Sequence, residues 1–123
     1  MQVQSAKVAQ LREGLRTNNW DEFRLFVRRQ MAEQNGRVKA SPQMADAARK
    51  ELGPGGHWSP EAVADRIVEF AKGLAGDDPE KQKMVVEAFR KGFAEAEKVL
   101  GALPEVSFKT RDRVEEKFRE WLK

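Results

Sequence analysis

The chain has 123 residues, of which 40% are hydrophobic and 35% are charged, and its formal net charge is +3 at pH 7. This length fits one domain, and the composition argues against a disordered tail and against a protein embedded in a membrane. No apolar run approaches the roughly 18 residues that a membrane span needs. The start lacks the apolar stretch of a secretion signal and the chain has no cysteine, so we expect a cytoplasmic protein.

Apolar residues recur at every third or fourth position along most of the chain, a spacing typical of amphipathic helices. The first such stripe, Val8, Leu11 and Leu15, predicts a helix over about residues 4–16. The polar segment Thr-Asn-Asn-Trp at residues 17–20 interrupts this stripe. The pattern therefore predicts that the first helix ends here.

A second helix is predicted over about residues 20–34. Asn19 and Glu22, three residues apart, have the layout of a capping box. Asn35 followed by Gly36 is a typical helix end. These signals mark both boundaries of the second helix.

The next three helices begin with Ser or Asp followed by Pro, the residue that fits the first helical position without losing a hydrogen bond. Glycine marks where they stop, and the Gly-Pro-Gly-Gly linker at 53–56 is the expected hinge. A Leu-Pro turn precedes the last helix. The expected helices cover about residues 42–52 (start Ser41-Pro42), 60–75 (start Ser59-Pro60, stop Gly76), 79–100 (start Asp78-Pro79, stop Gly101) and 108–122.

Together these patterns predict an all-α fold, an irregular bundle of about five to six amphipathic helices forming a single domain over residues 1–123. Charge divides the chain into two parts. Residues 1–56 contain ten Lys or Arg and six Asp or Glu, whereas residues 57–123 contain thirteen and fourteen. Seven of the ten basic residues in the first part are Arg, the residue that binds carboxylate or phosphate with two parallel hydrogen bonds.

From residue 57 onward the chain contains four short blocks of recognisable sequence, found in HWSPEAVADRIVEFAKGLAGDDP, FRKGFAEAEKVLG and ALPEVSFKTRDRVEEKF. The blocks are Trp58-Ser59-Pro60-Glu61, then Arg66, Ile67, Phe70 and Ala71, then Gly92, Phe93 and Ala96, and finally Leu103-Pro104. In combination they resemble an uncharacterised bacterial family, whose members are labelled "hydrogenase-4 component G" or "domain of unknown function".

The resemblance covers residues 57–122 and implies an α-helical bacterial domain. It implies no activity, catalytic residue or cofactor, and it does not extend to residues 1–56. The hydrogenase label is not supported by the composition, because iron–sulfur ligation uses Cys thiolates and the chain has none.

The residue inventory argues against several classes of enzyme and cofactor. A Ser–His–acid triad would have to use His57, the only histidine, which lies beside a helix start where it can cap the helix or stack on Trp58. One His and no Cys cannot build a zinc site, and the acids at 76–80 lack the spacing of a calcium loop. The linker at 53–56 lacks the Gly-Lys-Ser/Thr of a phosphate loop. We therefore expect no catalytic, metal or cofactor site.

Two charged features of residues 60–75 allow more than one interpretation. Glu61, Asp65 and Glu69 share one helix face and could do acid–base chemistry if buried, but a solvated outer face is the expected arrangement. Arg66 could cover the apolar face, pair with an acid from another helix or bind a ligand, and a structural ion pair is expected over a ligand contact.

The candidate interaction surface consists of arginines on the predicted second helix and tryptophans near helix ends, a combination enriched at protein interfaces. Its residues are Trp20, Arg24, Arg28, Arg29 and Trp121. The leading hypothesis is a non-enzymatic interaction module that binds a protein partner or forms a homo-oligomer.

The alternative is nucleic-acid binding by the basic N-terminal part, in which the helices at 20–34 and 42–52 would loosely imitate a helix-turn-helix. This reading adds the basic residues Arg12, Arg16, Arg37 and Lys39 to the surface. A third class, an enzyme that uses only carboxylates and arginine, would require a deep pocket with two buried acids.

Overall fold

The computed structural model describes the backbone of residues 2–123 and the side chains of residues 19–123. This part of the chain contains five α-helices and no β-strand, which confirms the expected all-α fold. The helices are α1 (Gln2–Val38), α2 (Ala45–Leu52), α3 (Pro60–Ala75), α4 (Pro79–Leu100) and α5 (Glu105–Trp121).

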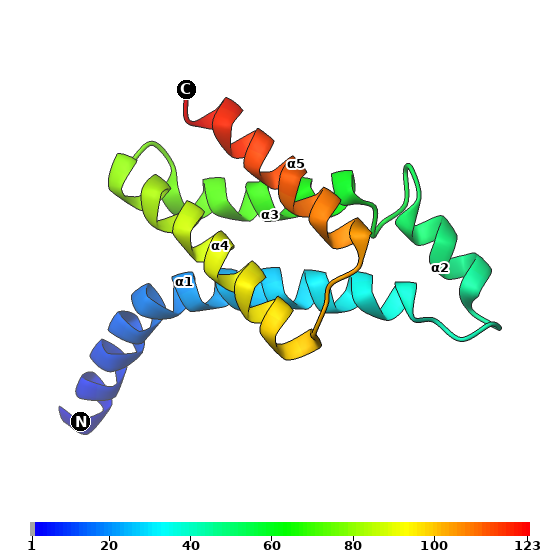
Figure 1. Cartoon of the computed structure of the whole chain (residues 1–123). Coiled ribbons are helices and arrows are strands. Elements are labelled where there is room, and N and C mark those ends of the chain that lie inside the picture. Colours follow the sequence, from blue (N-terminus) through cyan, green and yellow to red (C-terminus); the bar gives the residue numbers. More distant parts are fainter. Residues whose placement is uncertain (1) are drawn as a thin grey trace.

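The helices pack in two main pairs, α1 with α4 and α3 with α5, and the pairs contact each other through α3 and α4 and through α1 and α3. The short helix α2 lies at one end of the bundle, beside the C-terminal part of α1 (Figure 1). The first part of α1 extends beyond the other helices (Figure 1). The stripe predicted from Val8, Leu11 and Leu15 falls outside the residues whose side chains are described.

The predicted break at residues 17–20 is wrong, because α1 continues through this segment. Trp20 packs half-buried against the core, and Phe23 is fully buried one turn later. Asn19 is exposed, so its polar side chain is solvated without acting as a cap. Tertiary packing of the apolar face outweighs the local preference of Asn for helix ends. A single long helix therefore replaces the two that the sequence predicted.

Three other helix boundaries differ from the expected ones. Helix α1 ends at Val38, past the stop predicted at Asn35 and Gly36. Ser41 and Pro42 form a turn before α2, in which the carbonyl of Ser41 accepts a hydrogen bond from the amide of Met44 at 2.9 Å. The helix therefore begins at Ala45, about one turn later than predicted. In contrast, α5 begins at Glu105, three residues earlier than predicted, directly after Pro104.

The starts of α3 and α4 are as predicted. The hydroxyl of Ser59 accepts a hydrogen bond from the amide of Ala62 at 3.2 Å. The carboxylate of Asp78 accepts from the amides of Glu80, at 3.0 Å, and Lys81, at 3.4 Å. Both helices end at a glycine with positive φ, where a side chain would strain the backbone.

The core is built from one apolar face of each of the four long helices. Phe89 is fully buried and lies edge-on to Phe118, with ring centroids 5.7 Å apart. The largest buried apolar side chains are Phe23, Val27 and Met31 from α1, Val63 and Ile67 from α3, Val85, Phe89 and Phe93 from α4, and Val114 and Phe118 from α5.

Three polar side chains, Gln34 of α1 and Ser107 and Thr110 of α5, are completely buried beside this core, and Gln34 is the largest of them. Its amide nitrogen donates to the carbonyl of Trp58 at 3.0 Å and to the hydroxyl of Thr110 at 2.8 Å. Its amide oxygen accepts from the hydroxyl of Ser107 at 3.3 Å. The side chain thus connects α1 with α5 and with the segment before α3, and its polar atoms are satisfied as burial requires.

Candidate interaction surface

Helices α1 and α4 approach each other closely at Gly92, a buried residue of α4. A β-carbon placed on Gly92 would lie 2.9 Å from the carbonyl oxygen of Arg24 and 3.2 Å from the β-carbon of Val27. Only glycine allows the two backbones to approach this closely. This contact sets the spacing of the two helices next to the groove described below.

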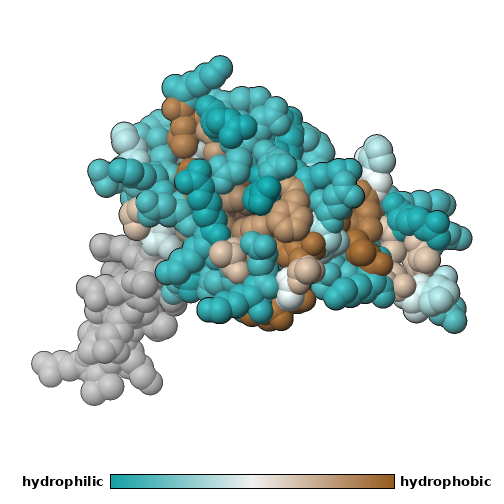
Figure 2. Space-filling view, in the orientation of Figure 1, coloured by the Kyte–Doolittle hydropathy of each residue, from teal (hydrophilic) through white to brown (hydrophobic). Residues whose placement is uncertain are grey.

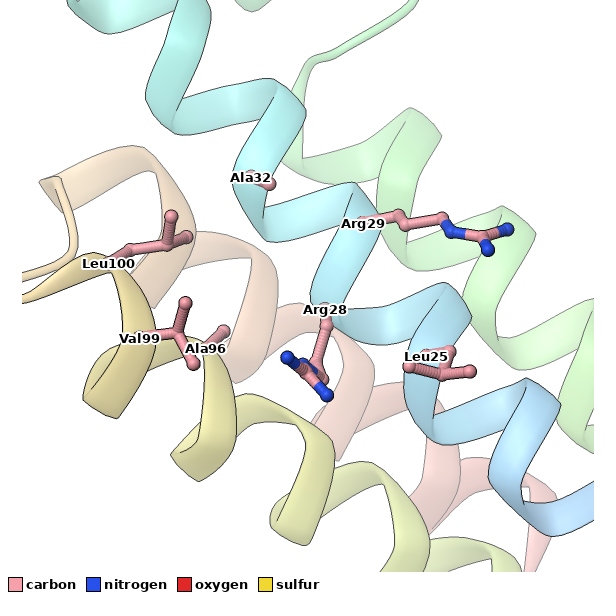
Figure 3. A pocket seen from close by; sticks show the side chains of 7 residues that line it. All are labelled: Leu25, Arg28, Arg29, Ala32, Ala96, Val99 and Leu100. Atoms are coloured by element: carbon pink, nitrogen blue, oxygen red, sulfur yellow. The ribbon is translucent and has the colours of Figure 1, made fainter.

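A shallow groove of about 260 Å³ lies between the two helices on the C-terminal side of this contact. Leu25 and Val99 on its rim are 39% and 67% exposed. Figure 2 shows small apolar patches among hydrophilic side chains on the side of the molecule where α4 and α5 lie in front. The groove is lined by Leu25, Arg28, Arg29 and Ala32 from α1 and by Ala96, Val99 and Leu100 from α4 (Figure 3).

The two arginines of the groove differ from most others in the described part of the chain. Arg28 extends from α1 toward the side chains of α4, whereas Arg29 extends from the other side of α1 (Figure 3). No carboxylate lies within ion-pair distance of either guanidinium among residues 19–123, although six other arginines there have such a partner. These six are Arg24, Arg37, Arg49, Arg90, Arg111 and Arg113.

Arg24 does not belong to a free basic face. Its guanidinium lies 2.8 Å from the carboxylate of Glu95 on α4 and 3.1 Å from that of Asp21. The contact with Glu95 is an ion pair whose angle is poor for a hydrogen bond. It therefore helps to hold α1 against α4. Of the three arginines predicted for the interaction surface, only Arg28 and Arg29 line the groove.

The two predicted tryptophans lie away from this groove. Trp20 is half-buried and lines a separate hollow of about 210 Å³ with Met84 and Ala88 of α4. Trp121 is half-buried at the end of α5, with its ring centroid 6.2 Å from that of Phe118. The five residues predicted from the sequence therefore do not form one continuous surface.

The third tryptophan, Trp58, lies between two guanidinium groups. The central carbons of Arg37 and Arg66 are 4.6 Å and 4.9 Å from its ring centre. Arg66 forms no ion pair in the described part of the chain, contrary to expectation, and donates instead to the amide oxygen of Gln30 at 3.1 Å and 3.2 Å. Burial lowers the pKa of Arg66. Arg66 is thus a structural residue that packs on an aromatic face.

His57 is exposed, and its ring lies edge-on to that of Trp58 with centroids 5.0 Å apart. Of the two roles expected for His57, capping a helix or stacking on Trp58, the structure shows contact with Trp58. A larger groove of about 890 Å³ lies between the α2–α3 linker and the start of α5, and His57 does not line it. Arg113 and Glu61 do line this groove, and they form an ion pair with each other. Among the described residues, no three His, Cys, Asp or Glu side chains are grouped as metal ligands would be.

The acidic face of α3 is not simply solvated, as the sequence suggested, because α5 contributes cations to it. Glu61 accepts from Arg113 at 2.6 Å and lies 3.1 Å from Lys117. Lys117 also lies 2.7 Å from Asp65. Hydrogen bonds from Arg113 and Lys117 lower the pKa of Glu61 below its ordinary value of 4.5, and the bond to Asp65 raises the pKa of Lys117. These ion pairs hold α3 against α5.

A pH titration of stability tests this arrangement. Because the pKa of Glu61 is lower in the folded protein, its ion pairs stabilise the fold above pH 4.5, and this stability is lost as the pH falls through the folded-state value. We expect Glu61→Gln to lower the melting temperature slightly at pH 7 and to have a smaller effect near pH 3. Glu69→Gln, in the same helix but without an ion pair among residues 19–123, is the control. Equal shifts at both pH values would contradict the assignment.

Comparisons of this chain with protein-family models, curated proteins and solved structures find no match. Within residues 2–123, none of the helices combines the length and the apolar character that crossing a membrane requires.

Proposed function

We propose that the protein is a non-enzymatic helical interaction module that binds a protein through the groove between α1 and α4. The supporting observation is the combination in that groove of exposed apolar side chains, Leu25 and Val99, with two arginines that lack acidic partners in the described part of the chain. Arginine is enriched at protein interfaces and among the residues that contribute most to their affinity. Leu25 and Val99 add exposed apolar area that a partner can cover.

Nucleic-acid binding receives less support. Of the basic residues assigned to it, Arg24 and Arg37 are engaged by acids of the same chain, and Arg12 and Arg16 fall outside the described side chains. A surface that binds phosphates needs several free cations, because each contact contributes separately to affinity. The groove instead offers mainly apolar contacts around two arginines.

We also propose that residues 57–122 are related to the bacterial family labelled "hydrogenase-4 component G". A cytoplasmic location is a further proposal. The resemblance carries no catalytic residue that could argue for an enzyme. Both proposals are compatible with a protein that acts by contact.

Substitution of Val99 by Glu tests the proposed surface. Val99 is 67% exposed, so the folded protein should tolerate a carboxylate there, whereas a partner seated in the groove would have to bury it. We expect Val99→Glu to weaken binding of the partner, whether a second copy or another protein recovered by cross-linking, by at least about tenfold. The measurement is a binding isotherm for each variant with the recovered partner.

Met84→Glu is the matched control, since Met84 is a 45% exposed apolar residue of the same helix outside the groove. Binding by Met84→Glu should equal that of the wild-type protein. Partner binding that both variants retain would contradict the proposed surface. Retention of DNA or RNA at low salt, lost when salt is raised and with no protein partner found, would favour the alternative function.

A further inference from the structure

We infer that the groove between α1 and α4 receives α1 of a second copy of this chain, with the two helices antiparallel. This inference rests on the proposed function and names its partner. It commits to self-association, in which the same surface of both copies meets around a twofold axis.

The surface concerned is the side of α1 that faces away from the core. Glu22, Leu25, Arg29, Ala32 and Gly36 are all exposed and follow one another at intervals of three, four, three and four residues. At 100° per residue these positions form one stripe opposite the buried Phe23, Val27 and Met31. This spacing is that of the contact seam between two packed helices.

The charges on this stripe are complementary to those of an antiparallel copy. Glu22 and Arg29 lie at the same side of α1, two turns apart, and neither has an ion-pair partner among residues 19–123. An antiparallel arrangement places each Glu22 near Arg29 of the other copy, so that two ion pairs form by symmetry. A parallel arrangement in register would place like charges together.

The shape of the stripe also suits a second helix. Ala32, one turn beyond Arg29 on the stripe, is exposed and has only a methyl group as its side chain. Small residues allow a neighbouring helix to approach closely. Leu25 and, across the groove, Val99 supply exposed apolar area for it to cover.

With Glu22 opposite Arg29, the twofold axis passes near Leu25, and the stripe meets its counterpart over the two turns from Glu22 to Arg29, about 10 Å at 1.5 Å per residue. A contact of this length is smaller than most specific interfaces, so the dimer should dissociate on dilution. Surface ion pairs contribute little individually, but each occurs twice here, and reversal of one charge converts both attractions into repulsions.

Charge reversal at Glu22 and Arg29 tests the inference by sedimentation velocity over a concentration series of the full chain. We expect Arg29→Glu and Glu22→Arg each to weaken dimerisation by at least about tenfold. The double variant Glu22→Arg/Arg29→Glu should restore it, because the antiparallel ion pairs are rebuilt in reverse. Arg119→Glu, an exposed substitution on α5 away from the stripe, is the control. Circular dichroism melts verify that every variant is folded.

Other outcomes would overturn the inference. A wild-type chain that stays monomeric at every concentration excludes the dimer, and a double variant no better than the single ones excludes the antiparallel pairing. A different outcome is that the chain binds another protein, that Val99→Glu abolishes this binding and that Glu22→Arg strengthens it. The partner is then an acidic protein. In that case the interaction function stands while self-association fails. If the wild-type chain stays monomeric and Val99→Glu weakens binding to no partner, both self-association and the proposed interaction surface are overturned.

Discussion

Replacing Gly92 by Leu should unfold much of the contact between α1 and α4 and lower the stability of the protein by about 3 kcal/mol. A β-carbon at this position would already lie 2.9 Å from a backbone carbonyl oxygen of α1, and backbone cannot move aside as the end of a flexible side chain can. The larger side chain would force the two helices apart. Thermal unfolding followed by circular dichroism should show a melting temperature lower by roughly 10 °C.

Gly73→Ala in α3 is the matched control for this substitution. Gly73 is exposed, lies inside a helix, and has no atom within 4 Å of the position of a β-carbon. Alanine there should stabilise the protein by about 0.5–1 kcal/mol, because it restricts the unfolded chain without a clash. The two glycines should therefore respond in opposite directions. A Gly92→Leu variant as stable as the wild type would show that the helices are not closely packed.

Loss of the buried amide of Gln34 should have the second large effect, with Gln34→Ala destabilising the protein by about 3 kcal/mol. The substitution removes three hydrogen bonds within the core, and it leaves the carbonyl of Trp58 without its side-chain donor. It also opens a cavity at a position that is fully buried. Equilibrium unfolding in urea would measure the loss as a lower transition midpoint.

Two further variants separate the contributions at Gln34. Gln34→Leu keeps most of the side-chain volume and removes only the hydrogen bonds, so we expect a smaller loss of about 2 kcal/mol. Gln82→Ala removes an exposed hydrogen bond to the carbonyl of Gly76 and should cost less than about 1 kcal/mol. If Gln34→Leu were as stable as the wild type, the hydrogen bonds would contribute no net stability.

The predictions of helix starts rested on local capping signals, which were correct at two positions and wrong at two others. Ser59 and Asp78 cap their helices as predicted, because a side-chain oxygen satisfies amides only two or three residues away. The same reasoning failed at Asn19 and Ser41. At Asn19 the burial of Trp20 and Phe23 keeps the helix continuous, and this burial depends on helices distant in sequence.

The candidate surface was only partly predictable. The sequence indicates Arg28 and Arg29 as surface residues of one helix, and both line the groove. Arg24 looked equivalent to Arg28 on the same helix face, yet Glu95 engages it from a helix about seventy residues away. Val99, the most exposed large apolar residue of the described part, has the spacing of a core residue and gave no signal of its own.

By itself the sequence determined that the chain is all-helical, where three of its helices stop or start, and which apolar residues line their inner faces. These properties depend on contacts within one or two turns of the same helix. Only the tertiary structure decided which arginines stay free of acidic partners, that Gln34 is buried, and that Gly92 lies against another backbone. These properties depend on which helices pack together. The spacing of residues along one helix does not specify which other helix it packs against.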